Sequence, residues 1–218
     1  MRTALVAGAT GLVGGHILRL LLEDAAYERV TALVRRGLPV SHRKLVQREI
    51  DFDLLRDLAA TSRVNDVFCA LGTTMRQAGS RDAFYKVDFT YVTELARLAS
   101  NQRASQFLMV SSLGANPRSR VFYNRVKGEA EEAVQRLRFD AIHLFRPSLL
   151  VGDRKEFRPA ERLGIVLARL VTPVLVGPLR PYRPIHAETV ARAMVRAARE
   201  GRRGVHVYRS DKIQALGQ

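Results

Sequence analysis

Short runs of β-branched and other apolar residues alternate along the chain with longer stretches in which apolar residues recur every three or four positions. The short runs predict strands, and the periodic stretches predict helices. The predicted strands are Thr3–Ala7, Val30–Val34, Leu45–Ile50, Val64–Ala70, Gln106–Ser111, Ala141–Phe145 and Gly204–Tyr208. The predicted helices are Gly14–Asp24, Leu54–Ala59, Tyr91–Ser100, Tyr123–Leu137, Ala160–Leu170 and Ala187–Glu200. This alternation predicts an α/β fold with a doubly wound parallel sheet that helices cover on both faces.

The length of 218 residues suits one domain. Proline and glycine become frequent between Pro147 and Pro184, so we expect the regular pattern of the sheet to be interrupted there. This segment follows a predicted strand and therefore starts at the edge of the sheet where ligands bind in such folds. We divide the single domain into a core, residues 1–146, and a small substrate lid with C-terminal elements, residues 147–218.

A glycine-rich turn joins the first predicted strand to the first predicted helix. Gly8 would allow a tight turn, Gly11 would let the backbone approach a pyrophosphate, and Gly14 would let the helix pack closely on the sheet. The free N–H groups at the start of the helix would then bind the phosphates. The turn predicts a Rossmann-type dinucleotide site. Its predicted residues are Gly8, Thr10, Gly11, Leu12, Val13 and Gly14.

Two arginines end the second predicted strand. Arg35 lies 21 residues after Gly14 (35 − 14 = 21), where an NAD enzyme has an acidic residue that holds the ribose hydroxyls. An arginine can instead pair with the 2′-phosphate of NADP(H). Arg35 and Arg36 are therefore predicted cofactor residues, with NADP(H) preferred and NAD(H) possible; the alternative is that both are solvated. Asp51, at the end of the third predicted strand, could accept a hydrogen bond from the adenine amino group or cap the following helix.

A tyrosine and a lysine lie four residues apart on a predicted helix. At this spacing Tyr123 and Lys127 share one face of the helix. A neighbouring ammonium favours the phenolate and lowers the pKa of a tyrosine, which makes it usable as a general acid or base. Ser111 and Ser112 end a predicted strand at the carboxyl edge of the sheet, where a hydroxyl could hydrogen-bond a substrate carbonyl or hydroxyl.

Together these motifs resemble the short-chain dehydrogenase/reductase superfamily in its extended or atypical branch. More narrowly, the chain resembles the Tat-interacting protein family of atypical reductases and its small bacterial relatives. The narrower resemblance rests on Phe68–Thr74, Tyr85–Asp88, Val110–Ala115, Tyr123–Gly128 and Phe145–Pro147. The resemblance implies that Ser112 polarises the carbonyl, that Tyr123 gives or takes the proton, and that Lys127 binds the nicotinamide ribose and tunes Tyr123.

The same resemblance implies further cofactor contacts. Leu71 and Gly72 would line the cofactor after the fourth strand, and Pro147, next to Arg146, would flank its nicotinamide end after the sixth. The chain departs from many relatives at Asp88, where they have asparagine in the helix after the fourth strand. Whether this position takes part in a proton relay is therefore an open question.

Composition narrows the choice of partner. The formal net charge is +15, but the arginines are scattered and form no basic tail, so no nucleic-acid partner is expected. The excess of positive charge should still raise the affinity of the protein for anionic ligands. The single cysteine and the five histidines, which show no close pairing, predict neither a disulfide nor a metal site. No membrane span is expected, and the cytoplasm is the expected compartment.

The sequence therefore predicts an NADP(H)-dependent oxidoreductase that transfers hydride between nicotinamide and a carbonyl or alcohol substrate. The substrate could be anionic, and the protein is expected to be a monomer or homodimer. Two alternatives stay open: a dinucleotide-binding regulatory or scaffold protein with little turnover, and an epimerase or isomerase that retains its cofactor.

Overall fold

The structure is a computed structural model of the chain, and it describes residues 1–57, 64–152 and 177–218. Seven parallel strands form the main sheet in the order β3-β2-β1-β4-β5-β6-β9. The strands are β1 Arg2–Ala7, β2 Tyr27–Val34, β3 Leu45–Glu49, β4 Asp66–Cys69, β5 Gln106–Val110, β6 Ala141–Arg146 and β9 Gly204–Arg209. The chain starts in the middle of the sheet and reverses direction at β1, which is the doubly wound Rossmann arrangement.

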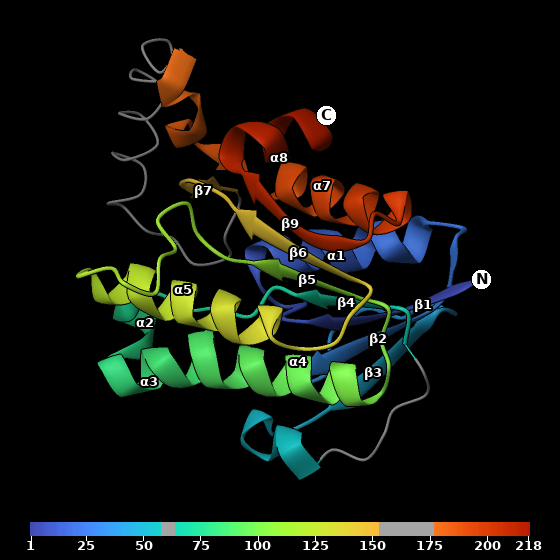
Figure 1. The fold of residues 1–218 in the computed structure, drawn as a ribbon. Coiled ribbons are helices and arrows are strands. Elements are labelled where there is room, and N and C mark those ends of the chain that lie inside the picture. Colours follow the sequence, from blue (N-terminus) through green and yellow to red (C-terminus); the bar gives the residue numbers. More distant parts are fainter. Residues whose placement is uncertain (58–63, 153–176) are drawn as a thin grey trace.

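Helices cover both faces of this sheet (Figure 1). On one face lie α1 Leu12–Glu23, α7 Ala187–Glu200 and α8 Ser210–Leu216, and their apolar side chains share a core with inward residues of β1, β2 and β6. On the other face α4 Tyr91–Asn101 and α5 Phe122–Gln135 pack over a second core. Side chains alternate between faces along a strand. In β5, for example, Phe107 and Met109 point to the second core and Leu108 to the first.

All seven predicted strands of the sheet are present, and the predicted helix Ala187–Glu200 has the bounds of α7. Of the predicted helix Leu54–Ala59, residues 58 and 59 lie outside the described residues, and the described part is wrong in type, because it belongs to the 3₁₀ helix η1 Phe52–Asp57, with a kink at Leu54. The predicted helix Ala160–Leu170 lies outside the described residues. Short elements were not predicted from the sequence: α2 Met75–Ala78, α3 Arg81–Tyr85, the π-helical segment η2 Lys86–Thr90 and the 3₁₀ helix η3 Gly177–Tyr182.

Of the predicted lid between Pro147 and Pro184, residues 153–176 lie outside the described part. The two ends that are described run side by side, since β7 Leu150–Val151 pairs in parallel with β8 Ile185–His186. At the first end, a Cβ added to Gly152 would lie 2.9 Å from Leu12 Cδ1. The segment that leaves β6 therefore contacts the first residue of α1, beside the glycine-rich turn.

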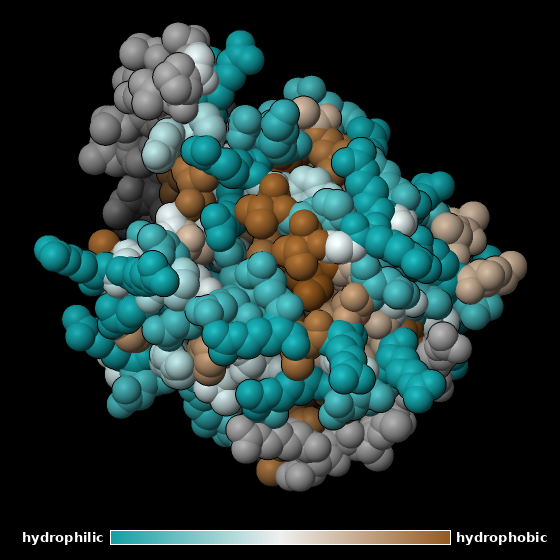
Figure 2. Space-filling view, viewed as in Figure 1, coloured by the Kyte–Doolittle hydropathy of each residue, from teal (hydrophilic) through white to brown (hydrophobic). Residues whose placement is uncertain are grey.

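The visible surface is mostly hydrophilic, with a hydrophobic band at its centre where Figure 1 places β9 (Figure 2). Val205 and Val207 are 48% and 46% exposed, and they pair with the buried Ile142 and Leu144 of β6. Among the described residues, no helix combines the length and the apolar character that a membrane-spanning segment needs.

Candidate cofactor and active site

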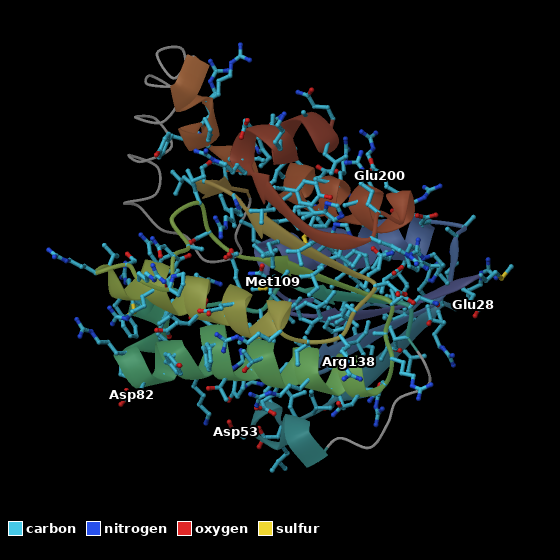
Figure 3. The ribbon with its side chains drawn as sticks, viewed as in Figure 1. Glu28, Asp53, Asp82, Met109, Arg138 and Glu200 are labelled. Atoms are coloured by element: carbon cyan, nitrogen blue, oxygen red, sulfur yellow. The ribbon has the colours of Figure 1, made fainter. Side chains whose placement is uncertain are left out.

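The predicted site residues come together at one edge of the sheet because all seven strands are parallel. The glycine-rich turn follows β1, Arg35 follows β2, Asp51 follows β3, and Gly72 follows β4. The two serines follow β5. Figure 3 gives the orientation: Glu28, Arg138 and Glu200 mark the opposite edge, where β2, β6 and β9 begin, and Asp82 of α3 lies toward the carboxyl edge.

The glycine-rich turn is too tight for other side chains at two of its three glycines. Gly8 has a φ of +86°, and a Cβ there would lie 2.4 Å from the Ala70 carbonyl oxygen. A Cβ on Gly14 would lie 2.0 Å from the Gly8 carbonyl oxygen. Gly11 is the N-cap of α1 and brings no capping side chain, and the first turn of the helix contains no acidic residue. The N–H groups at this helix end therefore suit an external anion such as a pyrophosphate.

The remaining residues of the turn divide between surface and core. Thr10 is exposed, Leu12 is half-buried, and Val13 is buried in the first core. Thr10 can therefore face a ligand through its side chain, whereas Val13 can do so only through its backbone.

A hollow of about 430 Å³ opens where β2 and β3 end, and its lining includes Arg35, Glu49, Ile50 and Asp51. Arg35 and Arg36 are both exposed, but Arg36 does not line the hollow. Asp51 Oδ1 accepts a hydrogen bond of 2.9 Å from the Asp53 backbone N–H, so the capping alternative is present in the structure. Glu49 was not predicted as a site residue; its position at the carboxyl end of a strand is the signal that could have identified it.

Lys127 of α5 is paired with a buried carboxylate. Its Nζ lies 2.8 Å from Asp88 Oδ1, and the two side chains are 6% and 0% exposed. Asp88 Oδ2 accepts a hydrogen bond of 2.8 Å from the Thr73 backbone N–H. Burial alone would lower the pKa of the Lys127 ammonium, but the negative charge of Asp88 and the nearby Tyr123 raise it above its ordinary value. Asp88 therefore contacts the predicted catalytic lysine directly.

Two serine hydroxyls are buried at the end of β5 without a hydrogen-bond partner in the described part of the chain, namely Ser111 Oγ and Ser112 Oγ. Buried hydroxyls are normally paired, so a ligand oxygen is a natural partner for them. Their backbone is fixed: the Ser111 N–H donates to the Phe145 carbonyl oxygen at 2.7 Å, and the Leu113 N–H donates to the Pro147 carbonyl oxygen at 3.0 Å. The buried Pro147 thus holds the serine loop in place.

The serine loop also packs against α5. A Cβ on Gly114 would lie 2.7 Å from Asn124 Nδ2, and a Cβ on Gly128 would lie 2.2 Å from the Pro117 nitrogen. These close approaches place the loop that begins at Ser112 beside the first two turns of the helix that carries Tyr123.

Close backbone approaches link the glycine-rich turn to Lys127. Gly8 lies against Ala70 at the end of β4, as described above. Two residues later, a Cβ on Gly72 would lie 3.3 Å from Asp88 Oδ1 and 3.4 Å from Lys127 Nζ. Gly72 is exposed and Leu71 is half-buried, so this stretch can form one wall of an extended ligand site that runs from the helix end of α1 to the lysine.

Two neighbouring side chains, Arg146 and Cys69, are not available to react with or bind a ligand. The Arg146 guanidinium donates from Nε to Glu131 Oε1 at 3.0 Å and from a terminal nitrogen to Oε2, so it is held by α5. Burial raises the pKa of the Cys69 thiol to about 11, which makes it a poor nucleophile. Among the described residues, no group of three or more His, Cys, Asp or Glu side chains could hold a metal ion.

Comparison with known proteins gives a family match over almost the whole chain. The model of the NAD dependent epimerase/dehydratase family matches residues 4–209. Protein HTATIP2 of Rattus norvegicus is 38% identical over 167 residues, which cover 75% of this chain and 69% of the relative. The mitochondrial protein fmp52 of Aspergillus clavatus is 35% identical over 224 residues, which cover 99% of this chain and 95% of the relative.

Solved structures share the fold at lower identity. MoeE5 in complex with UDP-glucose and NAD superposes with a TM-score of 0.70 at 20% identity, over 94% of this chain and 74% of that one. Human SDR39U1 (isoform 2) with NADPH superposes with a TM-score of 0.62 at 18% identity, over 99% of this chain and 80% of that one. Both are dinucleotide complexes with the same doubly wound arrangement.

Proposed function

The chain belongs to the NAD dependent epimerase/dehydratase family, on its atypical short-chain dehydrogenase/reductase side, and from this we propose that it is an NADP(H)-dependent oxidoreductase acting on a carbonyl or alcohol. One observation carries the proposal. Two buried serine hydroxyls without a partner in the described part of the chain lie on a loop packed against the helix of Tyr123 and Lys127. This is the arrangement that an oxygen of a substrate would complete.

The residues divide the work as follows. Ser112 Oγ donates a hydrogen bond to the substrate carbonyl oxygen, Tyr123 donates its phenolic proton to that oxygen, and Lys127 holds the nicotinamide ribose. The N–H groups at the start of α1 bind the pyrophosphate. When bound, the nicotinamide supplies the hydride in reduction and takes it up in the reverse direction. In that reverse direction Tyr123 accepts the proton of the alcohol.

For the cofactor we propose a preference for NADP(H). Its support is the position of Arg35 in the hollow at the end of β2, where a guanidinium can pair with a 2′-phosphate. Glu49 and Asp51 share this hollow and bring negative charge to it. We therefore expect the preference to be moderate and NAD(H) to bind as well.

The direct test is the loss of NADPH absorbance with a panel of aldehydes and ketones, followed by Tyr123→Phe on any substrate found. The ring of Tyr123 packs on Phe84 with a centroid distance of 5.4 Å, and phenylalanine keeps this contact. We expect the variant to fold and to bind NADPH as before, but to turn over about 10²–10⁴-fold more slowly, because positioned proton transfer is lost.

Tyr91→Phe is the matched control, since its hydroxyl donates to the exposed Asp53 at 2.6 Å and takes no part in the site. This control should keep full activity. Near-wild-type turnover by Tyr123→Phe would exclude Tyr123 as the proton donor.

A second candidate is epimerase chemistry with a retained cofactor. The family description and the sugar nucleotide bound to MoeE5 favour it. An epimerase would interconvert a UDP-sugar and its epimer without net change in NADPH absorbance, whereas a reductase consumes NADPH in proportion to product. Measuring both signals in the same reactions distinguishes the two.

A further inference from the structure

The Asp88–Lys127 pair lies in the interior of the protein, at the site rather than on its surface. Asp88 belongs to η2, the π-helical link between α3 and α4, and π-helical turns occur frequently at functional sites. An ammonium with only 6% of its side chain exposed would tend to lose its proton if it had no counter-charge. The carboxylate at 2.8 Å supplies that counter-charge, and the Thr73 N–H fixes its other oxygen.

We propose that Asp88 is a positioning residue that keeps the proton on Lys127 and holds the ammonium beside Gly72 and Tyr123. The inference rests on the proposed function, because it assigns Asp88 a task in the same site. A relay of protons through Asp88 is not needed for this task. The carboxylate acts through the lysine and does not touch the reacting atoms.

The charge balance of the site shows what Asp88 changes. With Asp88 present, the neutral phenol, the ammonium and the carboxylate sum to zero. With asparagine in its place the sum is +1, so the tyrosine and the lysine together must release their first proton at a lower pH, whichever of the two loses it. A reductase that needs both protons in place would then lose activity at a lower pH.

Other titratable groups around this pair leave the balance unchanged. From β4, the Cys69 thiol is neutral at working pH because burial raises its pKa to about 11. On α5, Glu129 is hydrogen-bonded by Tyr85 of α3 and lies 3.9 Å from Arg125. Asp88 is therefore the carboxylate within ion-pair distance of Lys127 in the described part of the chain.

The test is a direct titration of Lys127 by NMR. The chain has five lysines, Lys44, Lys86, Lys127, Lys155 and Lys212, so protein labelled with ¹³C,¹⁵N-lysine gives a simple side-chain spectrum. Lys127→Arg identifies the Lys127 resonance. In the wild type we expect Lys127 to titrate above the ordinary lysine value of about 10.4. In Asp88→Asn we expect its midpoint to fall by about one to three pH units. An unchanged midpoint overturns the proposal.

Asp53→Asn is the matched control. Asp53 pairs with Lys86 at 2.7 Å, but both side chains are about half exposed. Removing this carboxylate should move the Lys86 midpoint by only a fraction of a unit and should leave Lys127 unchanged. A shift of Lys127 in the control as large as in Asp88→Asn would mean that any lost surface charge has this effect, and would overturn the proposal.

A second measurement needs only the wild type, and therefore still tests the proposal if Asp88→Asn fails to fold. If the wild-type Lys127 resonance shows a neutral amine at pH 8, Asp88 does not keep the proton in place, and the proposal is wrong without any variant. On an active enzyme, Asp88→Asn should also move the alkaline limb of the kcat profile for reduction to lower pH. The NMR titration needs no turnover, so it still decides the role of Asp88 if Tyr123→Phe refutes the proposed function.

Discussion

At Gly14 the first turn of α1 and the start of the glycine-rich turn, at Gly8, are so close that one added methyl group would clash. The 2.0 Å between an added Cβ and the Gly8 carbonyl oxygen is far inside van der Waals contact, and both partners are backbone. The neighbouring Gly15 differs, because its Cβ would lie 3.5 Å from the Ala9 carbonyl oxygen, an ordinary contact. Of these two adjacent glycines in α1, only Gly14 is therefore required by close backbone packing.

Gly14→Ala should accordingly destabilise the protein by about 1–3 kcal/mol, because the helix must move away from the turn. The same movement should weaken NADPH binding. Gly15→Ala should leave binding unchanged and stabilise the protein by up to about 1 kcal/mol, since alanine is the better helix former. Urea unfolding and NADPH fluorescence titration measure both effects. Equal behaviour of the two variants would contradict the close packing at Gly14.

Arg35 gives a second prediction at this scale. Arg35→Asp should weaken NADPH binding and shift the preference toward NADH, because the pair with the 2′-phosphate, about 1.5–3 kcal/mol, is lost. Arg36→Asp makes the same charge change at a residue that does not line the hollow, so its preference should stay near that of the wild type. Equal affinity of the wild type for NADPH and NADH would contradict the assignment of Arg35.

At the scale of elements, the sequence was informative where burial imposes a pattern. The strands of the sheet were predicted because most are buried on both faces and read as continuous apolar runs. The helices α2 and α3 were not, because one turn is too short to show a 3.6-residue period. Their only local signals are the capping hydroxyls of Thr74 and Ser80.

The site divides in the same way. The glycine-rich turn, the serines and the spacing of Tyr123 and Lys127 are local, and they could be predicted from the sequence. The pairing of Lys127 with Asp88 joins residues far apart in the chain and depends on how η2 packs on α5, so no local pattern predicts it. The same holds for Glu49 in the hollow of Arg35, which two adjacent strands bring together.

One buried histidine links four elements of the first core. His143 of β6 contacts Gln106 of β5 through Nε2 and the Tyr208 hydroxyl of β9 through Nδ1, both at 3.1 Å. Gln106 in turn donates to the Ala198 carbonyl oxygen of α7 at 3.0 Å. Burial, together with the nearby His206 and Arg202, lowers the pKa of His143 to about 4. The neutral ring is thus part of the attachment of the edge strand β9.

This lowered pKa predicts a loss of stability in mild acid. Between pH 6.5 and 4 the unfolded chain binds a proton at this histidine and the folded protein does not, so stability falls as pH falls. The slope approaches about 1.4 kcal/mol per pH unit within that window. His143→Gln should lose less stability over the same range in urea unfolding, whereas the exposed His42→Gln should follow the wild type. If the free energies of unfolding of wild type and His143→Gln fell in parallel with pH, His143 would not be the cause of the loss of stability.

At the scale of the whole molecule, the charge of +15 surrounds the site that we propose binds an anionic dinucleotide. Several surface arginines are paired within the fold, as Arg19 and Arg192 are with Glu188, but 36 basic residues against 21 acidic ones leave a large excess. A field of this kind acts over distance and is screened by salt, with a Debye length of about 10 Å at 0.1 M. A contact pair such as the one proposed for Arg35 is screened much less.

The two contributions can be separated by kinetics. Raising the salt from about 0.05 M to about 0.5 M should slow NADPH association by about tenfold, because the field that steers it is screened. Dissociation should change little, because it reports contacts already formed.

A double variant, Arg136→Gln with Arg138→Gln, is the control. It removes two charges between the end of α5 and the start of β6, at the edge opposite the site. This variant should slow association slightly and leave dissociation unchanged. Arg35→Gln should mainly speed dissociation. The chain has no tryptophan, so stopped-flow fluorescence of NADPH reports both rates with little protein background. An association rate independent of salt would mean that the field of the excess positive charge does not steer NADPH to the site. The affinity for the cofactor would then come from local contacts alone.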